Sequence, residues 1–355
     1  MLNLDRSAFG VEEAMSADRS TGTVYWIDHF VVGTNDLLPW IEYAECVLGG
    51  APRPVSGLTT ESRLHRGPIF CFVDVGDCHA GAFLQQNEPL PPTRGLGTGL
   101  PRYGFFIRQE DVERQLRRLD DLGVLHAEAV RTGDLGDDGT SIVFQDPDGN
   151  QCELWAPVRM PDGAMDHATS AGVGRISHAV LESRDLRRTT DFMESFCTMQ
   201  PLGSGDVRHG VLAYGLAGGG RLIFQQVEEL ETRTRGFTRR GGLHTALTVQ
   251  ADDFLPTYKR MWDALPEWDY NSRGGRPAAG EVDEAALPAR TALHGSGAGR
   301  RWKELYGRGD DFYDWDTNCY HLVGGVPVEG SMAHYAGRYM EDYVADVFGK
   351  AEMGD

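Results

Sequence analysis

The stretch SIVFQDPDGNQCELWA, residues 141–156, predicts two β-strands joined by a tight acidic turn. Apolar residues flank the D-P-D-G-N run, and that run combines residue types typical of turns. A more divergent copy, DDFYDWDTNCYHLVGG, occupies residues 310–325. Both copies pass from an apolar strand through acidic residues and an asparagine into a second strand. At matching positions the first copy has Glu153 and the second has His321.

Repetition extends along the rest of the chain. Residues 25–50, YWIDHFVVGTNDLLPWIEYAECVLGG, predict a strand, a turn with a helix N-cap at Asn35 or Asp36, and an amphipathic helix. Residues 174–199, GRISHAVLESRDLRRTTDFMESFCTM, repeat this plan and match His178 to His29. Strand–helix starts also occur at residues 102–123 and 244–265. The repeats predict four modules of one strand, one helix and three strands, which begin near residues 24, 102, 174 and 243.

Bulk composition limits the class of protein. A length of 355 residues favours two domains, and a formal charge of −19 argues against nucleic acid or an anionic membrane as partner. No apolar run is long enough for a transmembrane helix. Residues 1–22 lack the features of a signal peptide and are expected to be a flexible arm. The six cysteines show no C-x-x-C spacing, so we expect reduced thiols in a cytoplasmic protein.

Four motifs, DHFVV, SHAVL, LHTALTV and FQDPDGNQCELW, resemble the vicinal oxygen chelate superfamily, which includes glyoxalase I, bleomycin-resistance proteins and type I extradiol dioxygenases. The resemblance covers roughly residues 23–325. It implies an α+β fold of four βαβββ modules in two tandem domains, each a curved mixed sheet around a cavity with flanking helices. The expected parts are a flexible arm (1–22), a glyoxalase-like domain (23–158), a metal-binding catalytic domain (172–328) with an insertion (266–310), and a C-terminal helix (329–355).

The family pattern places a histidine in the first strand of one module, a histidine in the first strand of the next, and a glutamate in its last strand. In the second half of the chain these positions hold His178, His244 and His321. The corresponding residues of the first half are His29, Arg102 and Glu153. An arginine has no lone pair to give to a metal, so the resemblance implies a metal site in the second half.

The chemistry of this ligand set leaves the metal open. Two histidines and one carboxylate form the facial triad of Fe(II) oxygenases, whereas three imidazoles also suit Zn(II). The resemblance implies Fe(II), with Mn or Zn as other possibilities. Glu329, beyond the last strand, is an alternative third ligand.

Two further residues are candidates for proton transfer. His209, in VRHGVLAYG, lies near the position of the acid–base histidine of extradiol enzymes, and its alternative is a hairpin role. Tyr313, in DFYDW, is a candidate assistant or an aromatic packing residue. Residues 266–310 form a long insertion, which the sequence predicts as either a lid or a surface loop.

The resemblance therefore implies an extradiol-type dioxygenase that cleaves a small phenolic or catecholic compound with O₂, and we expect a homo-oligomer. Two alternatives stay open. One is a metal-free binding protein of the bleomycin-resistance kind. The other is a metal-dependent lyase, isomerase or hydrolase, which uses the metal as a Lewis acid.

Overall fold

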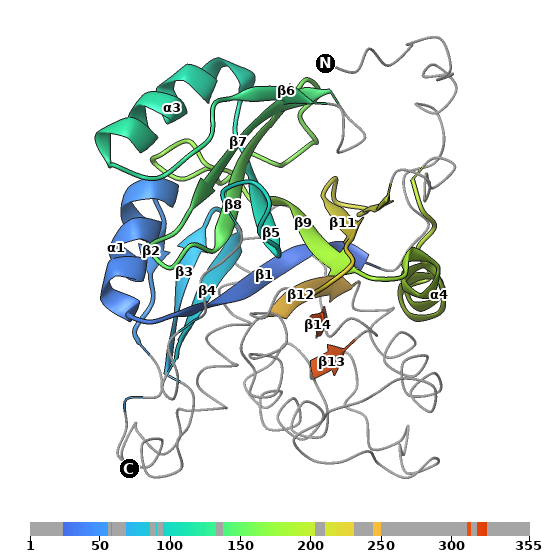
Figure 1. Cartoon of the computed structure of the whole chain (residues 1–355). Coiled ribbons are helices and arrows are strands. Elements are labelled where there is room, and N and C mark those ends of the chain that lie inside the picture. The colour runs from blue at the N-terminus through green and yellow to red at the C-terminus, as the bar shows by residue number, and fades with distance from the viewer. Residues whose placement is uncertain are drawn as a thin grey trace.

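The computed structural model describes residues 24–55, 58, 69–85, 90, 95–132, 138–202, 210–230, 244–249, 311–313 and 318–324. The predicted N-terminal arm, the insertion, the C-terminal helix and His209 lie outside these residues. Within them, the chain forms two mixed sheets of seven strands each, which confirms the predicted α+β fold class (Figure 1).

The first two modules show the predicted plan of one strand, one helix and three strands, and the described elements of the other two show part of it. The first module contains β1 (Val24–Thr34), α1 (Leu37–Leu48), β2 (Ala51–Pro52), β3 (Phe70–Val75) and β4 (Cys78–Leu84). The second contains β5 (Arg102–Phe106), a 3-10 turn η2 (Gln109–Asp111), α3 (Val112–Asp121), β6 (Val130–Thr132), β7 (Gly139–Gln145) and β8 (Gln151–Pro157). The third contains β9 (Ile176–Ser183), α4 (Leu186–Cys197), β10 (Val211–Gly215) and β11 (Arg221–Gln226). The fourth contains β12 (His244–Val249), β13 (Asp311–Tyr313) and β14 (Cys319–Gly324).

Each sheet combines one module from each predicted half. The first sheet has the order β13-β14-β12-β1-β4-β3-β2, so it joins the first and fourth modules. The second sheet has the order β10-β11-β9-β5-β8-β7-β6, so it joins the second and third modules. Antiparallel pairing of β1 with β12 and of β5 with β9 makes these joints. The modules are therefore nested, and neither sheet is built from one half of the chain alone.

Short polar side chains fix the starts of the helices that follow β1 and β9. Asp36 precedes α1, and its carboxylate accepts a hydrogen bond from the backbone N–H of Leu38. Asp185 does the same for α4 through the N–H of Arg187. Satisfying the free N–H groups of the first turn in this way is the usual role of an aspartate N-cap. The predicted cap of α1 is thus Asp36.

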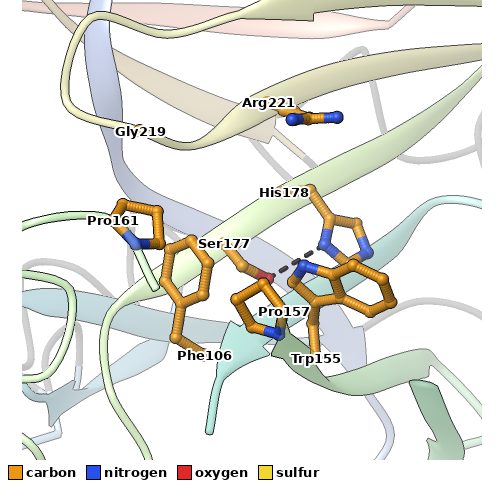
Figure 2. Close-up of a pocket in the computed structure, with 8 residues that line it drawn as sticks. All are labelled: Phe106, Trp155, Pro157, Pro161, Ser177, His178, Gly219 and Arg221. Atoms are coloured by element: carbon orange, nitrogen blue, oxygen red, sulfur yellow. Dashed lines mark hydrogen bonds between the residues drawn. The ribbon is translucent and has the colours of Figure 1, made fainter. Parts of the chain in front are cut away.

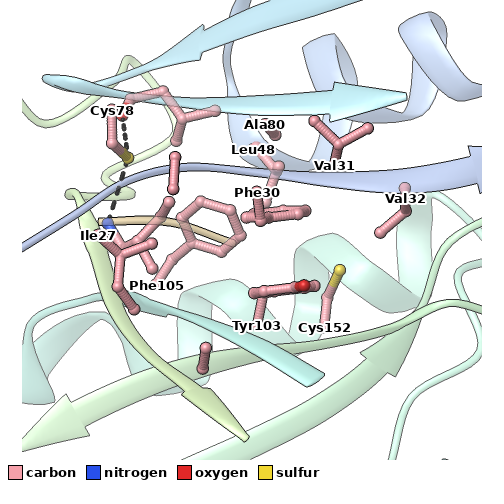
Figure 3. Close-up of a cluster of buried hydrophobic side chains, with 14 of the residues drawn as sticks. Ile27, Phe30, Val31, Val32, Leu48, Cys78, Ala80, Tyr103, Phe105 and Cys152 are labelled. Carbon is pink, nitrogen blue, oxygen red and sulfur yellow. Dashed lines mark hydrogen bonds between the residues drawn. The ribbon is translucent and has the colours of Figure 1, made fainter. Parts of the chain in front are cut away.

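The two sheets share one apolar core (Figure 3). Phe30 of β1 stacks on Tyr103 of β5 with ring centroids 4.0 Å apart, and Phe30 also meets Phe105 edge-on. The Tyr103 hydroxyl lies 3.1 Å from Thr245 Oγ1 of β12. Because these residues lie on the inner faces of the two sheets, the opposite face of each sheet remains for a site.

The D-P-D-G-N turn between β7 and β8 is held by its own side chains. Asp146 accepts hydrogen bonds from the backbone N–H groups of Asp148 and Asn150 and from the Asn150 side chain. Gly149 has a φ of 81°, a conformation that favours glycine. The motif therefore specifies a local turn.

The same turn also joins the two sheets. Asp148 accepts hydrogen bonds from the Thr34 hydroxyl and from the backbone and side-chain N–H groups of Asn35. The Asn150 amide donates to the carbonyl of Gly33. The turn of the second sheet is thereby attached to the C-terminal end of β1 in the first.

Among the helices of the described part of the chain, none is both long enough and apolar enough to cross a membrane.

Candidate metal centre

The outer face of the first sheet carries the candidate centre. Side chains alternate between the faces of a strand, and Thr245 of β12 points to Tyr103 in the shared core. His244, Ala246 and Thr248 therefore lie on the outer face. Strand register places His29 of β1 beside Ala246 on this face.

Two imidazoles converge there. Nε2 of His29 and Nε2 of His244 lie 3.1 Å apart, and both side chains are buried. Burial lowers the pKa of His29, and a smaller opposing effect comes from its hydrogen bond and charge interaction with Asp28. A neutral imidazole has a lone pair for a metal, so this pair fits a metal centre.

A β-bulge places Asp28 next to His29. Ile27 pairs with Leu247 and His29 pairs with Ala246, so Asp28 is an extra residue in the strand. Its carboxylate accepts a 2.7 Å hydrogen bond from Nδ1 of His29. This bond places the ring proton of His29 on Nδ1, as carboxylates do for many metal-binding histidines.

The third predicted ligand position lies in β14. Register pairs His321 with Ala246, which in turn pairs with His29, so the three residues form one row across β14, β12 and β1. The His321 side chain lies outside the described part of the structure. Among the residues the structure does describe, no group of three or more His, Cys, Asp or Glu side chains is placed to hold a metal ion. Among the described residues, His29 and His244 are the two histidines whose Nε2 atoms meet on this face.

A third buried histidine, which sequence analysis missed, extends the same row. His79 of β4 is the register partner of His29, and its Nδ1 donates a 2.7 Å hydrogen bond to Asp74, which also pairs with Arg53. Burial alone would raise the pKa of Asp74, but His79 and Arg53 outweigh this effect and lower it. Nε2 of His79 is buried and has no hydrogen-bond partner. The signal in the sequence was a histidine near the start of an apolar strand, CHAGAFL. The pairing of this strand with β1 is known only from the structure.

Aromatic rings surround these histidines. Phe72 lies edge-on to His29, with ring centroids 5.4 Å apart, and also meets His79. Phe83 lies beside His244. Apolar walls of this kind exclude water and strengthen polar interactions inside a site.

The second sheet holds a matching row with different chemistry. His178 of β9, Gly104 of β5 and Glu153 of β8 are consecutive register partners. His178 Nε2 lies 3.2 Å from Glu153 Oε2, and Nδ1 lies 2.9 Å from Ser177 Oγ. A Cβ at position 104 would overlap the His178 ring, so the glycine makes room for the imidazole. Ser177 is the bulged residue here, in the place that Asp28 has in the first sheet.

Arg102 precedes Gly104 by two residues, as His244 precedes Ala246 in the other sheet. Its Nε lies 2.8 Å from Glu153 Oε2, and the carboxylate is buried. Burial alone would raise the pKa of Glu153, but His178, Arg102 and Ser141 lower it to about 2. The fixed positive charge of the guanidinium thus balances the carboxylate where a metal ion would otherwise do so.

The space beside His178 is small (Figure 2). Phe106, Trp155, Pro161 and Arg221 line this pocket together with His178, and the enclosed space holds about one water molecule. Several of these residues belong to an apolar cluster on the outer face of the second sheet. This face is filled by the protein itself.

The structure therefore groups the predicted ligands in a new way. His178 lies in the second sheet, where it contacts Ser177 and Glu153, whereas His244 lies in the first sheet and contacts His29. Register places Tyr313 of β13 beside Cys319, two residues from His321; the Tyr313 side chain is not among those described. The histidine that lies beside His244 is His29, which sequence analysis assigned to the other half of the chain.

Comparisons with known proteins agree with this architecture. Residues 26–154 match the profile of the Glyoxalase/Bleomycin resistance protein/Dioxygenase superfamily. No curated protein matches the sequence significantly.

Two solved structures share the fold across most of the chain. A candidate dioxygenase from Bacillus subtilis superposes with a TM-score of 0.57 at 13% identity, covering 88% of each chain. A single-substitution variant of glyoxalase I from Zea mays superposes with a TM-score of 0.52 at 15% identity, covering 94% of this chain and 100% of that one. Residues 26–154 are therefore similar to the Glyoxalase/Bleomycin resistance protein/Dioxygenase superfamily, and the chain shares its fold with the two solved structures.

Proposed function

We propose that the protein is a metal-dependent dioxygenase of the extradiol type, which acts on a small phenolic or catecholic compound. The observation that carries the proposal is the convergence of His29 and His244 at Nε2, with Asp28 fixing the first ring. We propose His321 as the third ligand, because strand register places it in the same row. His29 thus replaces His178 in the ligand set predicted from sequence.

A bound divalent metal would supply Lewis acidity toward two neighbouring oxygens of the substrate and, if it is Fe(II), a place for O₂. The residues around it have separate tasks. His29 and His244 would hold the ion through Nε2 once the proton between the two rings is released. Phe72 and Phe83 keep water away from the reacting oxygens.

His79 is our candidate for the proton carrier. Asp74 fixes the proton on Nδ1, so the lone pair of Nε2 is available to take a proton from a substrate hydroxyl. Arg53 holds Asp74 in place through a 2.7 Å ion pair. His79 lies in β4, beside His29 of β1, so its Nε2 is on the strand next to a proposed metal ligand. The structure describes these contacts for His79, whereas His209 lies outside the described residues.

A second candidate function follows from the ligand chemistry. Histidine ligands without a carboxylate also suit Zn(II), which would act as a Lewis acid in a lyase or isomerase. Oxygen consumption with a panel of catechols separates the two functions, since the second one uses no O₂.

The first experiment is metal analysis of protein purified without oxygen. Wild-type protein should bind about one Fe(II), and His29→Ala should abolish binding, because one of the converging lone pairs is lost. His178→Ala is the matched control in the second sheet and should keep the ion. Loss of the ion from the His178 variant alone would refute the proposed ligand set.

A further inference from the structure

Besides Nε2 of His79, two further buried polar atoms on the outer face of the first sheet have no hydrogen-bond partner. They are Nε1 of Trp26 and Oγ1 of Thr248. Both residues are buried, and register makes them direct neighbours across β1 and β12. Thr248 lies on the same face as His244 and Ala246. Because buried polar groups in folded proteins are almost always satisfied, each such exception needs an explanation.

The second sheet has residues at the positions equivalent to Thr248 and Trp26, and these residues can be compared with them. Phe106 follows Gly104 by two residues, as Thr248 follows Ala246, and Phe106 is part of the apolar cluster that fills this face. Arg175 precedes His178 by three residues, as Trp26 precedes His29. Its guanidinium donates to the backbone carbonyls of Asp162 and Gly218. The two equivalent positions of the second sheet are therefore apolar or hydrogen-bonded, unlike Trp26 and Thr248.

We propose that Trp26 and Thr248 form a subsite that binds an acceptor oxygen of the substrate, such as a ring carboxylate or carbonyl. This proposal rests on the proposed function, in which the chelated oxygens lie near His29 and His244. The indole N–H only donates, and the threonine hydroxyl can donate as well, so the pair selects an acceptor.

The spacing fits a substituted aromatic ring. Two residues along a strand span about 7 Å. This distance separates Thr248 from Ala246, which lies between His29 and His321 in the row across β1, β12 and β14. A benzene ring that presents two neighbouring hydroxyls at one end and a carboxylate at the other spans a comparable length. The subsite thus distinguishes a substrate with an acceptor substituent from an unsubstituted or alkyl-substituted one.

Equilibrium binding to the metal-loaded protein without oxygen tests the subsite. Calorimetry with 3,4-dihydroxybenzoate and 4-methylcatechol should show tighter binding of the benzoate by wild-type protein. Thr248→Val and Trp26→Phe should each weaken benzoate binding by roughly tenfold, the usual effect of losing one hydrogen bond. Binding of 4-methylcatechol should not change.

Thermal unfolding of the metal-free protein provides a second measurement. Thr248→Val keeps the shape of the side chain and removes an unsatisfied buried hydroxyl, so its Tm should rise. Thr245→Val is the matched control on the inner face. It removes the contact with Tyr103, so it should lower Tm and leave the preference for the benzoate intact.

Three results would overturn the subsite: an unchanged preference in both variants, equal weakening of both compounds, or a lower Tm for Thr248→Val without any loss of benzoate binding. Failure of metal-loaded wild-type protein to bind either compound would instead overturn the proposed function, and the subsite with it.

Discussion

Asp28 and Ser177 occupy equivalent bulge positions and contact equivalent histidines. They differ in the group that they place against Nδ1 of the imidazole. Asp28 places a carboxylate against Nδ1 of His29, whereas Ser177 places a hydroxyl against Nδ1 of His178. A carboxylate raises the basicity of the ring and fixes its tautomer more strongly than a hydroxyl does. At the residue scale, this difference favours the first sheet for metal binding.

Replacing Asp28 tests this role. Asp28→Ser copies the bulge residue of the second sheet, so metal affinity should fall by roughly 10–100-fold. Competition with a chelator of known affinity measures the change. Ser177→Ala serves as the control and should leave the affinity unchanged. Equal affinity of the Asp28 variant and wild-type protein would contradict the assigned role.

Glu153 makes the stability of the protein depend on pH. Its pKa is about 2 in the folded protein, against an ordinary value of 4.5, so the unfolded chain binds a proton first as the pH falls. The carboxylate therefore stabilises the fold above pH 4.5, and this contribution is lost as the pH falls from 4.5 toward 2. The loss amounts to about 3 kcal/mol.

Urea unfolding at a series of acidic pH values measures this dependence. Glu153→Gln should be less stable than wild-type protein at neutral pH, because Arg102 loses its buried partner. Its stability should also fall less steeply below pH 4.5. Glu113→Gln, on the exposed surface of α3, should keep the wild-type slope. The same slope in both variants would show that Glu153 is not the responsible group.

At the element scale, the turn between β7 and β8 joins the second sheet to the end of β1 in the first. Asp148 accepts three hydrogen bonds from Thr34 and Asn35, just before α1 begins. Asp148→Ala should therefore lower the free energy of unfolding by about 2 kcal/mol, after allowing for partial exposure of the carboxylate.

Chemical denaturation of this variant beside Asp121→Asn checks the value. Asp121 is an exposed residue at the end of α3, so its replacement should change the stability little. Comparable effects of the two substitutions would show that the turn does not hold β1.

Most elements follow from local sequence, whereas the choice of partner strands does not. The strand around His29, the helix after Asp36 and their copies around His178 were predictable, because periodicity and N-caps are local signals. Alternation also indicates which residues share a face. It carries no information on whether β1 pairs with a strand of the second or the fourth module, because each module begins with a similar strand. For this reason His244 could be proposed as a ligand, but its contact with His29 could not.

Asp28 and His79 escaped prediction for related physical reasons. Asp28 shares a side with His29 only because of the bulge, and strict alternation would place neighbours on opposite faces. His79 acquires its role from its register with β1, which depends on tertiary structure.

At the scale of the whole molecule, the nested pairing predicts how fragments behave. Residues 24–158 contain both modules of the predicted N-terminal domain, yet they lack β12 and β9, the partners of β1 and β5. We expect this fragment not to fold cooperatively by itself, because β1 and β5 would each lose one hydrogen-bonded neighbour and become edge strands.

Expression of the fragment with residues 172–355 as a second chain provides the comparison. The two chains should form a complex with restored cooperative unfolding, measured by circular dichroism and gel filtration. A fragment of residues 24–158 that unfolds cooperatively without its partner would contradict nested pairing.

The pairing of β1 with β12 also sets the order of events during synthesis. The second sheet is encoded by consecutive modules, so it can close while the chain is still growing. β1 must wait for a partner that is translated about 220 residues later, or roughly 10–40 s at ordinary elongation rates. During that interval its edge is open to other chains. The face that carries His29 and His244 is therefore the last part of the protein to be assembled.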